Sequence, residues 1–255
     1  MQSHIFQKKC YQGSKRSSIL VKRTTSFLIL LALLSVMPRL EAHAADAQEH
    51  RYAVVYLDPH YGGRENGPAI DRKNKGKDVT LALARALQRE LQNLKIETFL
   101  SRDEDIFIPS GDRWFYAKKK GAHIYLSLRL RVQGRDCVQL YYAKRQPPQR
   151  KPHDKSVPEA ALSDPRVEAM ARESLRLAEF LQKGMQHAAP ALCGTVQTKK
   201  DVLFETSDFP AVIIEFGAAR RADQQSYLID PGKIEAIAVS IAQAVKEFIE
   251  ADSQQ

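Results

Sequence analysis

The sequence has little cysteine and no apolar run long enough to span a bilayer. Three cysteines in 255 residues are too few for a disulfide-rich scaffold. The longest apolar run, Ser26 to Met37, has twelve residues, whereas a membrane-spanning helix needs about 20. No stretch of the chain repeats, so a repeat architecture is also excluded.

The apolar run has the properties of a signal peptide instead. Six basic residues precede it: Lys8, Lys9, Lys15, Arg16, Lys22 and Arg23. The small residues of Ala42-His43-Ala44 follow it at the positions that a signal peptidase reads. We expect cleavage after Ala44 and a periplasmic or secreted protein of residues 45–255. An uncleaved membrane anchor is the alternative.

Most of the positive charge lies in this first segment. Residues 1–44 hold seven of the 39 Lys and Arg residues and one of the 30 acidic residues. The remainder has 32 basic and 29 acidic residues, a net charge of +3. A balanced surface of this kind excludes a nucleic-acid-binding protein and predicts no membrane partner once the signal peptide is removed. The remaining 211 residues suit a single domain.

Two cysteines, Cys137 and Cys193, remain after cleavage. In an oxidising compartment such a pair can close a disulfide bond, and we expect this one to do so. Two buried free thiols are the alternative.

Strand-like and helix-like patterns alternate along the chain. A twisted, mostly parallel or mixed α/β sheet with helices on both faces is therefore predicted. The final helix should be capped by Asp230, and the helix over 109–120 should point Trp114 and Phe115 inward. A proline-rich basic stretch, residues 144–166, is expected to be an exposed loop. The expected strands cover 54–57, 96–100, 123–130, 137–143, 202–205 and 211–216. The expected helices cover 78–91, 109–120, 167–188 and the residues after 230.

Five stretches, in this order, resemble the zinc-dependent N-acetylmuramoyl-L-alanine amidases, the cell-wall hydrolases of the CwlV and AmiC type. They are Leu57-Asp58-Pro59 with Gly62-Gly63; Lys77 to Ala82; Leu100 to Asp103; Gly121 to Leu128; and Phe209 to Gly217. The resemblance covers nearly all of the chain after the signal peptide. It implies the α/β catalytic-domain fold of these enzymes.

The resemblance also implies where a zinc site should be. Active members hold zinc with two His and one Glu, and a further Glu serves as general base and acid. The ligand positions correspond here to Tyr61, Gly76 and Arg129, none of which is a zinc ligand of that set. Glu215 matches the catalytic carboxylate. The metal site is therefore predicted to be lost, with no cofactor in its place.

A substitute metal site is the alternative. His60, Glu65, His123 and Glu215 are its candidate ligands. His123 is the first residue of its predicted strand. It is therefore about 20 Å from the carboxyl end of that strand, where the site should lie, at ~3.3 Å per residue. Arg129 is always charged and would repel a metal from this position.

The expected function is that of an amidase-like protein that does not cut. Its partner would be peptidoglycan or a cell-wall protein. Arg129 and Arg131 would hold peptidoglycan through the carboxylates of the stem peptide, with Tyr61 and His60 as further binding candidates. An active amidase with a rearranged metal site, and a regulator that binds another amidase or a divisome protein, are the alternatives. We also predict that Arg129 takes the place of the metal and pairs with Glu215.

Overall fold

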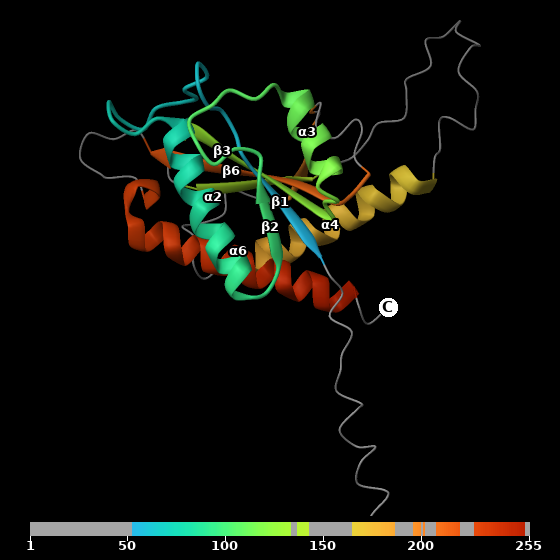
Figure 1. The fold of residues 1–255 in the computed structure, drawn as a ribbon. Coiled ribbons are helices and arrows are strands. Elements are labelled where there is room, and N and C mark those ends of the chain that lie inside the picture. The colour runs from blue at the N-terminus through green and yellow to red at the C-terminus, as the bar shows by residue number, and fades with distance from the viewer. Residues whose placement is uncertain are drawn as a thin grey trace, which may run out of the picture. The chain divides into compact units, whose positions relative to one another are not determined.

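Six strands form one mixed sheet in the computed structural model of the protein (Figure 1). The structure describes residues 53–133, 137–142, 165–186, 196–199, 201, 208–219 and 227–252, all of which belong to one compact unit, Arg51–Gln255. The strands are β1 (Val54–Pro59), β2 (Glu97–Leu100), β3 (Ile124–Gln133), β4 (Cys137–Tyr142), β5 (Gln197–Thr198) and β6 (Ala211–Ala219). The helices are α2 (Gly76–Asn93), α3 (Ser110–Lys119), α4 (Pro165–Met185), the 3-10 turn η4 (Tyr227–Ile229) and α6 (Pro231–Asp252).

The strand order is β2-β1-β3-β6-β4-β5. Neighbouring strands are parallel except for β4, which runs antiparallel to β6. The prediction of a mostly parallel or mixed sheet is thus confirmed. Because β1, β3 and β6 are parallel, their carboxyl ends meet at one edge of the sheet, where open α/β sheets place their binding sites.

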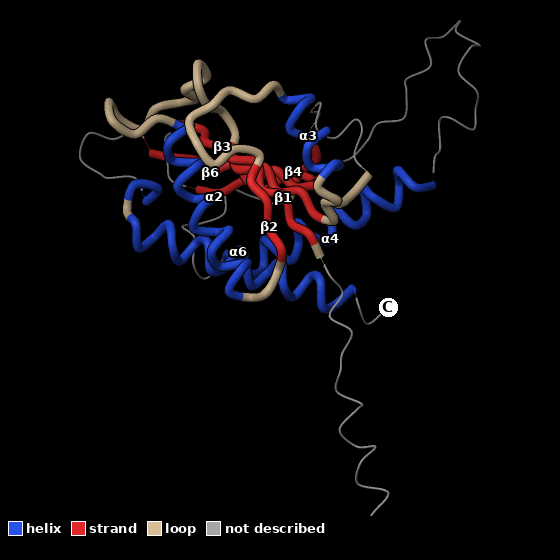
Figure 2. Tube along the Cα trace, viewed as in Figure 1, coloured by secondary structure: helices blue, strands red, loops and turns tan. Residues whose placement is uncertain are grey.

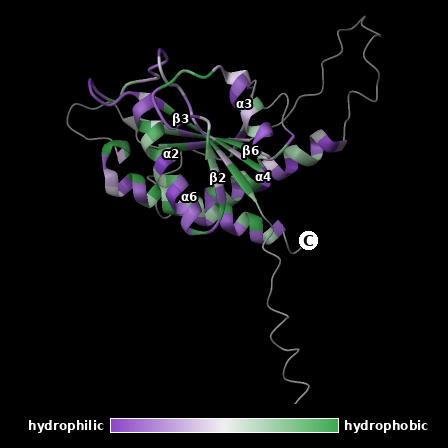
Figure 3. Cartoon of the chain, in the orientation of Figure 1, coloured by the Kyte–Doolittle hydropathy of each residue, from purple (hydrophilic) through white to green (hydrophobic). Residues whose placement is uncertain are grey.

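Helices cover both faces of the sheet, as predicted. On one face, α2, α4 and α6 bury a large aliphatic core that includes Leu57, Leu126 and Ile214. On the other face, Trp114 and Ala117 of α3 pack on an aromatic cluster around Tyr125 and Phe209. Figure 3 shows the same division by hydropathy: the strands are mainly hydrophobic (green), and the helices alternate between hydrophobic (green) and hydrophilic (purple) residues.

The start of α6 also follows the prediction. Asp230 accepts hydrogen bonds from the backbone N–H groups of Gly232 and Lys233, at 2.9 and 3.2 Å. These are two of the N–H groups that a helix start leaves without partners. Pro231 occupies the first helical position, where a missing N–H costs nothing.

One inward residue of α3 was predicted wrongly. Phe115 is 61% exposed, whereas Arg113, Trp114 and Ala117 are buried. The buried stripe of this helix begins at Arg113 because that guanidinium pairs with a buried carboxylate of β1. Phe115 lies on the exposed side of the helix, where its ring contacts that of Tyr116.

Several predicted boundaries change or lie outside the described residues. Residues 165–166, expected to end the exposed loop, are the first turn of α4, since proline fits a helix start. The rest of that loop, the signal peptide at 1–44, Cys193 and the strand at 202–205 lie outside the described residues. Two-residue β5 has no sequence signal and was not predicted. In the described part of the chain, no helix is long and apolar enough to cross a membrane.

A buried ion pair joins β1 to α3, and a serine that follows β2 donates to its carboxylate. The Asp58 carboxylate has no solvent exposure, and its Oδ1 accepts from Arg113 Nη1 at 2.5 Å and from Ser101 Oγ at 2.8 Å. Its Oδ2 accepts from Ser127 Oγ at 3.1 Å, and His60 Nδ1 lies 3.7 Å from it. Burial opposes the charge, but these neighbours hold the pKa of Asp58 well below its usual range.

Two arginines fasten the loop that follows β1. Arg113 donates to the carbonyl oxygens of Pro59 and Tyr61. Arg102 donates to the carbonyl oxygens of Pro59, His60 and Lys77, so its role is structural. The loops after β1 and β2 therefore lie together at one end of the sheet (Figure 2).

We expect Arg113→Met to destabilise the protein by about 3–5 kcal/mol, because it leaves the Asp58 carboxylate buried without its partner. The double variant with Asp58→Asn should recover part of that loss. Urea unfolding of the wild type, the two single variants and the double variant measures both the destabilisation and its recovery. Arg89→Met is the matched control, since Arg89 pairs with Glu235 at the surface, and it should cost less than about 1 kcal/mol.

Candidate binding site

A tight turn follows β1 and faces the carboxyl ends of the neighbouring strands. Three consecutive residues, Tyr61, Gly62 and Gly63, have φ angles of +69°, +130° and +54°. A Cβ atom on Gly62 would lie 2.1 Å from the carbonyl oxygen of Ile106. Glycine is therefore required at this position, both for the backbone conformation and for the close approach of the 101–109 loop.

Tyr61 lies at the first ligand position that the resemblance implies. Its hydroxyl donates to the carbonyl oxygen of Leu130 at 2.9 Å, and its ring packs against Gly67. Burial raises the pKa of this phenol, although the nearby Arg129 opposes the shift. The side chain is thus a protonated hydrogen-bond donor that closes the gap between the turn and β3.

Gly76 lies at the second implied ligand position, as the first residue of α2. Its N–H donates to the carbonyl oxygen of Pro68 at 2.6 Å. A Cβ atom built on Gly76 would lie 3.0 Å from that same oxygen and 3.3 Å from Gly67 Cα. The backbone of the chain itself therefore fills the space that a longer side chain would need here.

Arg129, at the third implied position, does not form the predicted pair with Glu215. Its Nη1 donates to Asp201 Oδ2 at 2.6 Å, and both side chains are nearly buried. Its Nε donates to Ser127 Oγ at 3.3 Å, which connects it to the buried Asp58. No ion pair between Arg129 and Glu215 is found among the described residues.

Glu215 pairs instead with two other cations. Arg131 Nε lies 3.0 Å from its Oε1, and Lys199 Nζ lies 3.0 Å from its Oε2. Arg129 and Glu215 are indeed aligned on adjacent strands, as β3 and β6 pair in that register. The next aligned pair on the same face of the sheet is Arg131 and Gly217, two positions further along. Because Gly217 has no side chain, Arg131 can extend across it to Glu215, which explains why the predicted partner was wrong.

The candidate ligands of a substitute metal site do not come together. The His60 imidazole lies beside Asp58 and stacks edge-on against Tyr61. His123 is at the opposite end of the sheet, as predicted, where its Nδ1 accepts from the N–H of Val54. Glu65 is exposed and forms backbone hydrogen bonds with Gly62. Within the described ranges, no group of three or more His, Cys, Asp or Glu residues could hold a metal ion.

The residues present therefore do not fit the zinc that the resemblance implies for active members. A protonated phenol, a glycine and a guanidinium provide no lone pairs of the kind that zinc binds. The remaining carboxylate, Glu215, is already paired with two cations. The arrangement instead brings three cations, Arg129, Arg131 and Lys199, into contact with two carboxylates, Asp201 and Glu215. We call these five residues the charged row.

Sequence reasoning missed Lys199 and Asp201. Both lie just after β5, in a stretch with no helical or strand periodicity, so no pattern pointed to them. Lys199 also lies over the ring of Tyr141, 4.5 Å from its centre. The sheet pairing of β4 with β5 brings this stretch beside Glu215.

Cys137 is disulfide-bonded. It is buried at the start of β4, opposite Gly217 of β6. Its predicted partner, Cys193, lies outside the described residues, and the pairing of these two cysteines stays a prediction.

Comparison with known proteins shows the family to which this chain belongs. The family model for N-acetylmuramoyl-L-alanine amidase matches residues 55–247. The chain is 36% identical over 85 residues to the amidase AmiC of Escherichia coli O6:H1, a stretch that is 32% of this chain and 20% of AmiC. It is 40% identical over 75 residues to AmiA of E. coli K12, which is 29% of this chain and 26% of AmiA. The matched stretches thus span about a quarter or less of these relatives.

Among solved structures, the catalytic domain of the amidase CwlV from Bacillus (Paenibacillus) polymyxa var. colistinus has a TM-score of 0.59 to this structure. The likeness covers 78% of this chain and 98% of CwlV at 21% identity. The architecture is therefore that of α/β amidase catalytic domains. With its match over residues 55–247, the chain belongs to the N-acetylmuramoyl-L-alanine amidase family.

Double-mutant cycles test the assignment of partners in the site. Arg131→Met with Glu215→Gln, and Arg129→Met with Asp201→Asn, should each show a coupling free energy of about 0.5–3 kcal/mol in urea unfolding. Arg129→Met with Glu215→Gln should show a smaller coupling. If this third pair were the most strongly coupled, the partners assigned here would be wrong.

Proposed function

We propose that the protein is exported and binds peptidoglycan in the cell envelope without cutting it. The basic segment, the apolar run and Ala42-His43-Ala44 support export. Membership of the amidase family supports peptidoglycan as the partner. The observation that carries the proposal is the identity of the residues at the three ligand positions, above all the Arg129 guanidinium.

The guanidinium groups of the site suit a carboxylate ligand. Arginine binds carboxylates through paired N–H donors, and the stem peptide of peptidoglycan carries carboxylates. Within the chain the Asp201 carboxylate already accepts from one of these donors, since its Oδ2 lies 2.6 Å from Arg129 Nη1. Arg131 exposes 36% of its side chain and can reach a ligand that approaches from solvent.

Glu215 does not act as a catalytic base in this proposal. A general base in an amidase takes a proton from a metal-bound water, and the chain's own ligand positions supply no metal ligands. Held between Arg131 and Lys199, the carboxylate instead fixes two cations in place. Its role is to position the binding groups.

Co-sedimentation with isolated sacculi tests this function. The protein should bind intact sacculi and should bind much less to sacculi whose stem peptides have been removed. Arg131→Gln should weaken binding at least about tenfold, since a hydrogen bond to a charged group contributes about 1.5–3 kcal/mol. Arg89→Gln, the same change at a surface ion pair far along α2, is the matched control and should bind like the wild type.

A second substitution should act in the opposite direction. Asp201→Asn removes the internal carboxylate that competes for Arg129, so this variant should bind intact sacculi more tightly. Equal binding to sacculi with and without stem peptides would contradict the proposal. Release of free L-alanine amino groups from sacculi would favour an active amidase, and absence of any sacculus binding would favour a regulator with a protein partner.

A further inference from the structure

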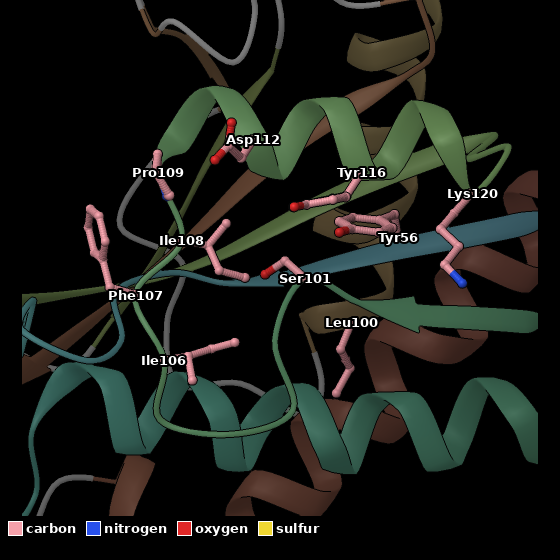
Figure 4. A pocket seen from close by; sticks show the side chains of 10 residues that line it. All are labelled: Tyr56, Leu100, Ser101, Ile106, Phe107, Ile108, Pro109, Asp112, Tyr116 and Lys120. Carbon is pink, nitrogen blue, oxygen red and sulfur yellow. The ribbon is translucent and has the colours of Figure 1, made fainter.

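A cleft lies apart from the residues of the charged row. It has a volume of about 470 Å³ and is bounded by α3, by the end of β2 and by residues 106–109 (Figure 4). It shares no residue with the group formed by Arg129, Arg131 and Glu215. The proposed function does not use it.

Tyr56 has an unpartnered hydroxyl in this cleft. Its side chain is only 2% exposed and stacks on Tyr125, with ring centres 5.7 Å apart. Among the described residues, nothing forms a hydrogen bond with this hydroxyl, and its oxygen faces the cleft. It is not one of the fully buried polar atoms without a partner, which are Tyr125 Oη and His60 Nδ1 in the described part of the chain, so it is open to a ligand in the cleft. Burial raises the pKa of the phenol, so it stays protonated and able to donate.

Other polar groups face the same space. Asp112 and Tyr116 of α3, with Lys120 at its C-cap, are spaced four residues apart and so line one side of the cleft. In Figure 4 the hydroxyl oxygens of Tyr56 and Tyr116 point toward its middle, whereas the Ser101 hydroxyl donates to Asp58. The cleft thus presents two hydroxyls and a carboxylate, with an ammonium at one end.

The remaining walls are apolar. The side chains of Leu100, Ile106 and Ile108 line the cleft, and the ring of Phe107 stands at its rim. On this ring, the Arg64 guanidinium lies 4.3 Å from the centre. Hydroxyl-binding groups beside apolar and aromatic surfaces match a sugar ring, which has hydroxyls at its edge and C–H groups on its faces. The volume falls within the range of about 300–1,000 Å³ that is usual for ligand sites.

We infer that this cleft binds a sugar residue, with Tyr56 donating the hydrogen bond that its hydroxyl lacks within the chain. The choice of an N-acetylhexosamine of a glycan strand rests on the proposed function, because that sugar type forms the strands of peptidoglycan. The hydroxyl-binding character of the cleft rests on the cleft alone. Together the two sites would hold both parts of the polymer, the peptide at the charged row and the glycan beneath α3.

Titration of the purified protein with N,N′-diacetylchitobiose tests the inference, with amide chemical shifts followed by NMR. Shifts should concentrate on residues 99–101 and 106–120. Tyr56→Phe should raise the Kd about two- to tenfold, the usual effect of losing one neutral hydrogen bond. Tyr116→Phe, on the exposed side of the cleft, should also raise it. Tyr125→Phe is the matched control, since Tyr125 is equally buried but does not line the cleft.

Three results would overturn the inference: no shifts at millimolar chitobiose, unchanged affinity in Tyr56→Phe, or an equal loss in Tyr125→Phe. The sacculus experiment separates this outcome from failure of the proposed function. Chitobiose binding without sacculus binding would reject the proposed function and support the sugar site. Sacculus binding without chitobiose binding would reject the sugar site alone.

Discussion

The buried ion pair between Asp58 and Arg113 holds the binding end of this protein together. A carboxylate without solvent exposure persists only where charge and hydrogen bonds compensate it, and here a guanidinium and two serine hydroxyls do so. The same guanidinium holds the turn after β1 through the carbonyl oxygen of Tyr61. Through Ser127 the network continues to Arg129. The position of the charged row thus depends on this pair.

The charges of the site follow from that arrangement. Aligned positions of β3 and β6 bring the oppositely charged Arg129 and Glu215 side by side, where either charge would be costly if it had no partner. The chain resolves this with two separate pairings: Asp201 neutralises Arg129, and Arg131 with Lys199 neutralises Glu215. Both pairings use residues from the stretch after β5. Arg129, at one of the implied ligand positions, is therefore part of the protein's own electrostatic network.

Much of the fold was predictable because its patterns are local. The alternation of β3, the four-residue spacing along α2 and the cap at Asp230 each reflect contacts within or near one element. Arg113 was not recognised, since a charged residue in a helix is usually exposed and its carboxylate partner lies 55 positions away. The partners of Arg129 and Glu215 were missed for a similar reason, because Lys199 and Asp201 lie in a stretch without periodicity. Side-chain pairing across a sheet depends on three-dimensional positions that spacing alone does not provide.

The central claim is that fixed cations occupy the place of a metal in this member of the amidase family. Elemental analysis of protein purified without chelator, combined with an assay for cleavage of a muramyl peptide, tests it most directly. The account predicts far less than one zinc per chain and no cleavage, with or without added zinc. One zinc per chain whose removal abolishes cleavage of the muramyl peptide would contradict it.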